Sequence, residues 1–414
     1  MPAVTFTTGG ALRKSALRQA NERLILSVIR QNDAVSRADI VRITGLSPSS
    51  VTFIVNRLKH DKIVCEEQLP NFSQVGRRPT ALRLRGSARI AIGVEITPSG
   101  ARIATTDLND ADLGLKTVPW SPNYEVFFEK THAAVRTLLG RLTPGQVLGV
   151  GVALPGTIDR TTGKIIAAEN LGWFGVEAGD RLRRNLKVPF HFENEAKLSA
   201  LAEMWYSDRD AAPLRNFVSV IARGGVGTGV IVDGRILQGA TSAAAEFGHL
   251  SIYPDGRKCP CGNVGCWEQY ASDLALLRTY AEESGQAVAG EETVEGVLAK
   301  ARSGDAAAQR ALKATAQHVG TGFLNLVLAL NPQAIVVGDY LAQAWDLIEE
   351  DVWAVLRRRA PTYFLAGLRV FPSRHGTESS LRGALALVLS RFFNSFGERN
   401  PARPAGIVTM QESA

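Results

Sequence analysis

Apolar residues recur at helical spacing in three short stretches near the start of the chain. The first stretch predicts a helix over residues 19–31. The second begins at Ser36, an N-cap in a capping-box pattern, and ends at Gly45, where a left-handed residue is easily accommodated. The third follows Ser47, an N-cap with proline at the first helical position. Two helices joined by a short glycine turn are typical of a helix-turn-helix, whose second helix enters the major groove of DNA.

The residues after the third helix predict a β-hairpin. Residues 63–64 and the alternating residues 81–85 are the two candidate strands, which makes the domain a winged helix-turn-helix. The tip carries two arginines on a rigid Gly-Arg-Arg-Pro turn, suited to phosphates or to an A·T-rich minor groove. The alternative is a small protein-binding three-helix unit with solvated arginines. The candidate DNA-contacting residues are short polar or basic: Arg37, Ser47, Ser49, Ser50, Thr52, Asn56, Arg57, Arg77 and Arg78.

The net charge of +7 is concentrated at this end of the chain. Residues 1–86 contain 14 Lys and Arg against 6 Asp and Glu, whereas the remainder contains 33 basic and 34 acidic residues. Because only the first part carries a basic excess, we expect it alone to meet a polyanion.

From residue 89 onward, short apolar runs alternate with helical patterns, which predicts an α/β architecture in two lobes. A helix is expected over residues 126–139 and a further strand over 101–106. Residues 224–229 are rich in glycine and could cradle a phosphate through backbone N–H groups or form a tight hairpin. Buried strands are predicted at residues 90–94, 147–154, 217–222 and 334–337.

Three of the four cysteines lie close together, at Cys259, Cys261 and Cys266, and His249 precedes the first by ten positions. Thiolate and imidazole are ligands that zinc prefers, and one His with three Cys fills a tetrahedral shell without leaving a position for water. The pattern predicts a structural Zn²⁺ site. Ordinary free cysteines beside a surface histidine are the alternative.

Length and composition set broader limits. The 414 residues suffice for two to four domains, and 45% hydrophobic residues with 21% charged ones are typical of a globular protein with an ample core. The chain contains no run of eighteen apolar residues, so the sequence predicts no transmembrane helix. The N-terminus lacks the apolar core of a secretory signal. Clustered cysteines beside a lone Cys65 suit a reducing compartment, so we expect a cytoplasmic protein without a membrane partner.

Several longer motifs resemble the ROK family (repressors, open reading frames and sugar kinases), in its DNA-binding repressor branch. The first domain carries the resemblance in SRADIVRITGLSPSSVTFIVNRL and the following GRRP. The resemblance covers about residues 15–395. The motifs of the larger domain are GVGVALPGTID (149–159), AENLGW (168–173), ENEAKLSALAE (193–203), AAEFGHL (244–250) and CPCGNVGCWE (259–268).

The resemblance implies an actin-like, hexokinase-like pair of α/β lobes that binds a sugar in the cleft. The expected domains are the winged helix-turn-helix at 1–86, a first lobe at 87–200 completed by a C-terminal helix at about 380–396, a second lobe with the zinc loop and dimer interface at 201–380, and a disordered tail at 397–414. The family's zinc ligands match the His and three Cys above. Its sugar-contacting residues match Asn194, Glu246, His249 and Glu268, with Asn170, Gly156 and Glu195 as further candidates.

The sequence departs from the family's kinases along the nucleotide path. Their Asp-x-Gly-Gly-Thr phosphate loop is replaced by Glu95 to Ser99, in which Pro98 removes an N–H donor. Glu195 stands at the position of the catalytic Asp, and a small displacement there costs much rate. Arg223 and Asp339 replace residues of two further nucleotide loops. We therefore expect no ATP cofactor and no catalytic residue.

These observations favour a sugar-responsive transcriptional repressor that binds operator DNA as a homodimer or a dimer of dimers, with a sugar-transport protein as a possible regulatory partner. An ATP-dependent sugar kinase with an appended DNA-binding domain is the competing hypothesis. A third hypothesis treats the second domain as a dimerisation module only. The retained Asn194, Glu246 and Glu268 speak against it, because a vacated pocket has no need of buried carboxylates.

Overall fold

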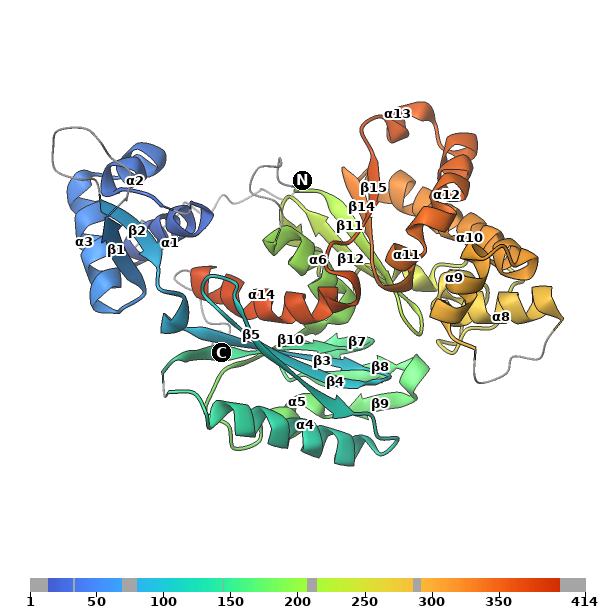
Figure 1. The fold of residues 1–414 in the computed structure, drawn as a ribbon, viewed down its shortest axis with the longest axis horizontal. Helices are drawn as coiled ribbons and strands as arrows, with labels where there is room; N and C mark the ends of the chain where they lie inside the picture. The colour runs from blue at the N-terminus through green and yellow to red at the C-terminus, as the bar shows by residue number, and fades with distance from the viewer. Residues whose placement is uncertain are drawn as a thin grey trace, which may run out of the picture. The chain divides into compact units, whose positions relative to one another are not determined.

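The computed structural model describes residues 14–32, 34–68, 80–143, 145–206, 214–285 and 292–394. The described residues form two compact units, one within residues 1–86 and 390–394 and the other within residues 87–389. Figure 1 shows the order of the helices and strands along the chain.

The first unit is a three-helix domain with a two-stranded hairpin. Its elements are α1 (Lys14–Gln31), α2 (Arg37–Thr44), α3 (Pro48–His60), β1 (Val64–Gln68) and β2 (Thr80–Leu84), the two strands being antiparallel. The predicted caps are confirmed, because Ser36 and Asp39 form a reciprocal capping box at the start of α2. Gly45 ends that helix at φ +69°, and Ser47 accepts the N–H of Ser50 at the start of α3. The hairpin tip with Arg77 and Arg78 lies outside the described residues, as does the 397–414 tail.

A five-stranded sheet in the order β10-β6-β3-β4-β5 begins the second unit. β6 runs parallel to β3 and β10, whereas β4 and β5 continue as an antiparallel meander. The strands are β3 (Ile90–Thr97), β4 (Gly100–Asp107), β5 (Asp112–Pro119), β6 (Val147–Leu154) and β10 (Phe190–Asn194). A smaller antiparallel sheet, which the sequence did not predict, consists of β7 (Thr157–Asp159), β8 (Lys164–Ala168) and β9 (Trp173–Val176).

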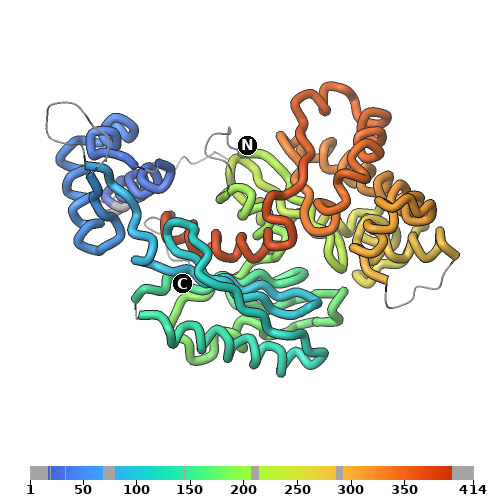
Figure 2. The backbone as a smooth tube through the Cα atoms, viewed as in Figure 1, coloured from blue at the N-terminus to red at the C-terminus, as the bar shows by residue number. Residues whose placement is uncertain are grey.

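Helices cover both faces of this first sheet (Figure 1). α4 (Tyr124–Leu139) and α5 (Ala178–Arg183) lie on one face, and α14 (Ser379–Asn394) lies on the other. Figure 2 shows that α14 returns from the far end of the chain to lie beside strands formed much earlier. The approach requires glycine, since a Cβ at Gly151 would lie 2.0 Å from the carbonyl oxygen of Ala384. The lobe boundary near residue 200 stays a prediction.

A second five-stranded sheet has the order β13-β12-β11-β14-β15. Its strands are β11 (Phe217–Ala222), β12 (Val226–Val232), β13 (Arg235–Ile236), β14 (Ala334–Val337) and β15 (Arg369–Pro372). The helices that accompany it are α6 (Glu195–Trp205), α7 (Glu268–Ala271), α8 (Asp273–Ser284), α9 (Val294–Arg302), α10 (Ala306–Leu330), α11 (Asp339–Gln343), α12 (Trp345–Arg359) and α13 (Thr362–Leu365).

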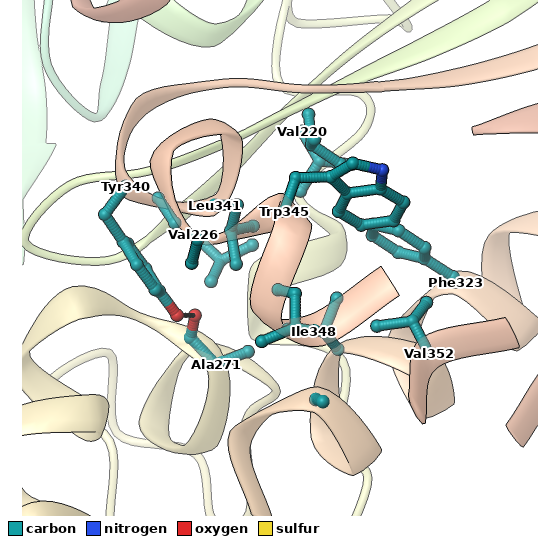
Figure 3. Close-up of a cluster of buried hydrophobic side chains, with 14 of the residues drawn as sticks. Val220, Val226, Ala271, Phe323, Tyr340, Leu341, Trp345, Ile348 and Val352 are labelled. Atoms are coloured by element: carbon teal, nitrogen blue, oxygen red, sulfur yellow. Dashed lines mark hydrogen bonds between the residues drawn. The ribbon is translucent and has the colours of Figure 1, made fainter. Parts of the chain in front are cut away.

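The core behind the second sheet is shown in Figure 3. Val220 and Val226 of the sheet share one buried cluster with Phe323 of α10 and Trp345 of α12. The buried hydroxyl of Tyr340 donates to the carbonyl oxygen of Ala271, which satisfies its polar end inside an apolar environment.

The four predicted buried strands are confirmed, and the glycine-rich run forms a hairpin. β11 and β12 pair antiparallel with Ala222 opposite Val226, so residues 223–225 are the turn. Gly227 and Gly229 lie within β12, and a Cβ at Gly229 would lie 2.2 Å from the carbonyl oxygen of Ala196 on α6. The lack of a side chain at these two glycines therefore lets α6 pack closely against β12. None of the helices among the described residues has the length and apolar character needed to cross a membrane.

Candidate functional site

The first wall of the candidate site is built where two parallel strands end. β6 and β10 are neighbours in register, with Leu154 opposite Asn194, so the chain leaves both strands at the same edge of the sheet. Asn194 caps α6, its Oδ1 accepting the N–H groups of Ala196 (2.9 Å) and Lys197 (3.1 Å). Its Nδ2 donates to the carbonyl oxygen of Gly156 (3.0 Å) and thus ties the two strand ends together.

The opposite wall comes from the loop that follows β13 and presents Glu246. Two residues of this loop, Ser242 (φ +63°) and Ala245 (φ +71°), occupy the left-handed region although neither is glycine. A hydrogen bond holds each of their carbonyl oxygens, one donated by the Lys197 ammonium and the other by the Thr228 hydroxyl. The strained backbone is thus fixed at Ser242 and Ala245, and this positions Glu246 at the cavity.

Glu268 is positioned by the tryptophan that precedes it. Trp267 is 1% exposed and stacks against α10 where Gly322 leaves room, because a Cβ there would lie 1.9 Å from the indole ring. The indole N–H donates to the carbonyl oxygen of His318 (2.9 Å). Glu268 itself is 4% exposed and approaches the turn between β11 and β12 at Gly225.

All seven predicted sugar-contacting residues line one cavity between the two sheets. They are Gly156, Asn170, Asn194, Glu195, Glu246, His249 and Glu268. Glu169, which the sequence did not single out, lines the same cavity. Carboxylates and amides that converge on one cavity can donate to and accept from the hydroxyl groups of a sugar.

Two titratable groups beside this cavity are perturbed by burial. Desolvation raises the pKa of the Glu195 carboxyl to about 8, so the group is largely protonated at neutral pH. Lys197 is 1% exposed, and the same effect lowers the pKa of its ammonium, with the nearby carboxylates of Glu193 and Glu246 acting in the opposite direction. A protonated Glu195 can donate to a hydroxyl group.

The predicted metal ligands converge beside the cavity. The ligand atoms of His249, Cys259, Cys261 and Cys266 all lie within 4.8 Å of one another. Cys261 Sγ and Cys266 Sγ are 3.7 Å apart, and His249 Nδ1 is 3.8 Å from Cys259 Sγ. Tetrahedral Zn²⁺ with bonds of about 2.3 Å to sulfur places sulfurs about 3.8 Å apart, so the donor set and its spacing fit that ion. The cluster could therefore hold a metal.

His249 belongs to both sites, since it turns Nδ1 toward the cysteines and also lines the cavity. Glu268, another cavity residue, follows the candidate ligand Cys266 by two positions, and its Oε1 accepts a hydrogen bond from the Cys259 thiol (2.9 Å) in the metal-free protein. A metal held by these cysteines would therefore fix the wall that carries two of the seven candidate residues.

The positions expected to disfavour a nucleotide come together at one end of the cavity. Arg223 Nη1 donates to Glu95 Oε1 (3.0 Å) and Nη2 to Asp339 Oδ1 (2.5 Å). Arg102 Nε donates to the other oxygen of Glu95 (2.6 Å), and both guanidinium groups also donate to the carbonyl oxygen of Thr377. Arg223 lies 128 positions from Glu95 and 116 positions from Asp339 along the chain, so the sequence could not reveal these two ion pairs.

In the DNA-binding unit, Ser47, Ser49, Thr52 and Asn56 are exposed, and Ser50 is half-buried. Two predicted DNA contacts already have protein partners. Arg37 donates to Asn56 and Glu66, while the Arg57 guanidinium pairs with the buried carboxylate of Glu22 on α1. Their roles toward DNA stay predictions.

A winged helix-turn-helix joined to two α/β lobes around a polar cavity defines a class of DNA-binding regulators related to sugar kinases. Residues 91–391 match the ROK family and residues 18–64 match the family described as winged helix-turn-helix DNA-binding. The chain belongs to the ROK family, which confirms the predicted fold class.

Similar proteins include regulators and kinases. The xylose repressor of Caldicellulosiruptor bescii is 26% identical over 392 residues, covering 90% of this chain and 96% of the repressor. The crystal structure of a ROK family transcriptional regulator homologous to the Escherichia coli Mlc protein shares the fold, with a TM-score of 0.78 at 21% identity over 92% of this chain and 98% of that one. A ROK glucokinase from Streptomyces griseus, solved with glucose and AMPPNP, has a TM-score of 0.61 at 25% identity over 72% and 98% of the two chains.

Proposed function

We propose that this protein is a sugar-responsive transcriptional repressor that binds operator DNA through its winged helix-turn-helix and a sugar through the cavity of its ROK domain. The observation that carries this proposal is the convergence of all seven predicted residues on one cavity, in a chain that also has a DNA-binding unit. Relatives named as repressors that match nearly the whole chain support the regulatory role.

The sugar acts by differential binding. It releases DNA only if it binds the conformation with low DNA affinity more tightly than the conformation with high affinity. A homodimer, or a dimer of dimers, would present two recognition helices to a palindromic operator, and a change in their spacing would weaken both contacts together. The protein would act in the cytoplasm, where a sugar-transport protein could also regulate it.

Zinc is the metal we propose for the cluster of His249 and the three cysteines. Four protein ligands leave no open position, so the ion would be structural. Its role would be to hold His249 and Glu268 on one rigid loop, and the seven cavity residues would make the contacts with the sugar.

A sugar screen followed by a DNA-binding assay tests the proposal. Sugars such as xylose, glucose and N-acetylglucosamine are first ranked by the rise in melting temperature that they cause, because a ligand of the native state stabilises it. Promoter fragments selected by the protein are then titrated with and without the best sugar. We expect tight binding without sugar and weaker binding with it. Promoter binding that no sugar changes would contradict the proposal.

The competing function is an ATP-dependent sugar kinase, since kinases share the fold. Several features argue against phosphotransfer. Glu195 stands where the family's kinases carry a catalytic Asp, so its carboxylate is displaced by one methylene, and Arg223 is paired with Glu95 and Asp339. A coupled ATPase assay with the same sugars separates the hypotheses, because the repressor predicts no turnover.

A further inference from the structure

The charged groups of the cavity are unevenly balanced. Four glutamates line it: Glu169, Glu195, Glu246 and Glu268. Among the described residues of the lining, Arg223 is the single Lys or Arg. A ligand with an anionic group would therefore have Arg223 as its one strong counter-ion.

The guanidinium of Arg223 is already bound by the chain itself. Its two outer nitrogens donate to Glu95 and Asp339, which are 0% and 2% exposed, and to the carbonyl oxygen of Thr377. Glu95 also receives Arg102, so this group contains two arginines and two carboxylates and is neutral overall. Charge-assisted hydrogen bonds to buried carboxylates are strong, and an incoming anion would have to displace them.

The backbone of the adjoining turn is occupied in the same way. The N–H of Gly224, a donor that a phosphate could use, donates to Asp273 Oδ1 (2.7 Å). The N–H of Arg223 donates to the carbonyl oxygen of Gly225 (3.0 Å). The outer nitrogens of the Arg223 guanidinium and the N–H groups of Arg223 and Gly224 therefore all have internal partners.

Asp339 is held here at a conformational cost. It occupies the left-handed region at φ +51°, and its Oδ2 is buried without a hydrogen-bond partner among the described residues. Positive φ and an unsatisfied buried oxygen both disfavour folding, so they are retained where the surroundings or a function require the residue. The ion pair with Arg223 is the interaction that offsets this cost.

We infer that Arg223 is a specificity-determining residue of the cavity. The chain's own carboxylates bind its guanidinium where the anionic group of a ligand would otherwise bind, so the cavity admits uncharged sugars and excludes phosphorylated ones. This inference rests on the proposed function, because it concerns the same cavity. It follows from charge: a phosphate group would face the carboxyl groups of Glu169, Glu246 and Glu268 beside the largely protonated Glu195, while its one candidate counter-ion is engaged elsewhere.

Inorganic phosphate is a probe that tests the pairing without any sugar. The double variant Glu95→Gln, Asp339→Asn removes the two negative charges that neutralise the Arg223 guanidinium. We expect phosphate to leave the melting temperature of the unaltered protein unchanged after correction for ionic strength, and to raise that of the double variant. The same double variant with Arg223→Gln added should lose the effect, which separates this site from basic groups elsewhere in the chain.

Single variants keep the test valid if the double variant does not fold. Asp339→Asn alone frees one side of the guanidinium and should give a smaller effect in the same direction. Glu283→Gln is the matched control, since Glu283 pairs with Arg310 at the exposed surface away from the cavity. A phosphate effect in the unaltered protein that Arg223→Gln abolishes would overturn the inference, as would the absence of a gain in folded Asp339→Asn.

A second comparison uses glucose against glucose 6-phosphate and N-acetylglucosamine against its 6-phosphate. We expect each phosphate ester to bind the unaltered protein at least about tenfold more weakly than its parent sugar. A phosphate ester that binds more tightly than its parent sugar would overturn the inference and leave the proposed repressor intact. If no sugar of either kind binds, the proposed function fails, while the phosphate titration still decides whether Arg223 is withheld from anions.

Discussion

Replacing Gly225 by alanine should damage sugar binding without damaging the fold. A Cβ at this position would lie 2.7 Å from both Asn170 Nδ2 and Glu268 Oε2, whereas ordinary contact begins at 3.4 Å. Each polar group must therefore retreat by about 0.7 Å. Both are the ends of flexible side chains, and Gly225 is absent from the residues with positive φ, so the backbone accepts alanine.

The expected loss follows from the hydrogen bonds that these two groups would make to a sugar. A hydrogen bond to a charged group contributes about 1.5–3 kcal/mol, so weakening one of them lowers affinity roughly ten- to hundredfold. Isothermal titration with the sugar found by screening measures the affinity, and thermal unfolding measures the stability. Gly140→Ala is the control, because its nearest neighbours would lie 3.6 Å from the new Cβ. Unchanged sugar affinity in a folded Gly225→Ala protein would refute the roles of Asn170 and Glu268.

Further predictions concern the metal, the buried carboxyl and the DNA-binding helix. Cys261→Ser should reduce bound zinc to background by elemental analysis and weaken sugar binding; sugar affinity that survives the loss of zinc would show that the two sites are independent. Because the folded-state pKa of Glu195 is raised from 4.5 to about 8, folding is favoured at low pH and its stability falls as pH rises through this window. Glu195→Gln should therefore flatten the pH dependence of the folding stability between about pH 4.5 and 8 and make the variant more stable, relative to the unaltered protein, at pH 8 than at pH 4.5. An identical pH profile of stability in the two proteins would contradict the raised pKa of Glu195. Asn56→Ala, on the exposed face of α3, should lower operator affinity roughly tenfold or more while binding to random DNA changes little, and equal losses on both DNAs would mean that Asn56 reads no base.

Features encoded by neighbouring residues could be predicted from the sequence. The capping box of Ser36 and Asp39 and the left-handed Gly45 depend on contacts within a few positions. The four buried strands β3, β6, β11 and β14 stood out as short apolar runs between helical patterns. The metal cluster was visible because three thiols lie close along the chain and only His249 had to be assigned at a distance.

Features that depend on distant contacts could not be predicted in this way. Glu95, Arg223 and Asp339 appeared in the sequence only as replacements in nucleotide loops, and their mutual pairing required the fold. Lys197 is the single charged residue between Glu195 and Glu203 of α6, but nothing in the sequence indicates that its ammonium reaches the carbonyl oxygen of Ser242. The role of Asn194 as the N-cap of α6 could have been recognised, since Asn at a strand-to-helix junction favours that position.

In the proposed repressor, one sugar-binding cavity and one DNA-binding unit are energetically coupled, and a test of reciprocity measures this coupling. The affinity for the sugar is measured by titration on the free protein and on the protein saturated with operator DNA, and the affinity for the operator is measured with and without saturating sugar. Linkage requires the two factors to be equal. We predict that operator DNA weakens sugar binding by the same factor, at least about fivefold, by which the sugar weakens operator binding. A sugar that binds with the same affinity to the free and the DNA-bound protein would show that the two sites are not coupled.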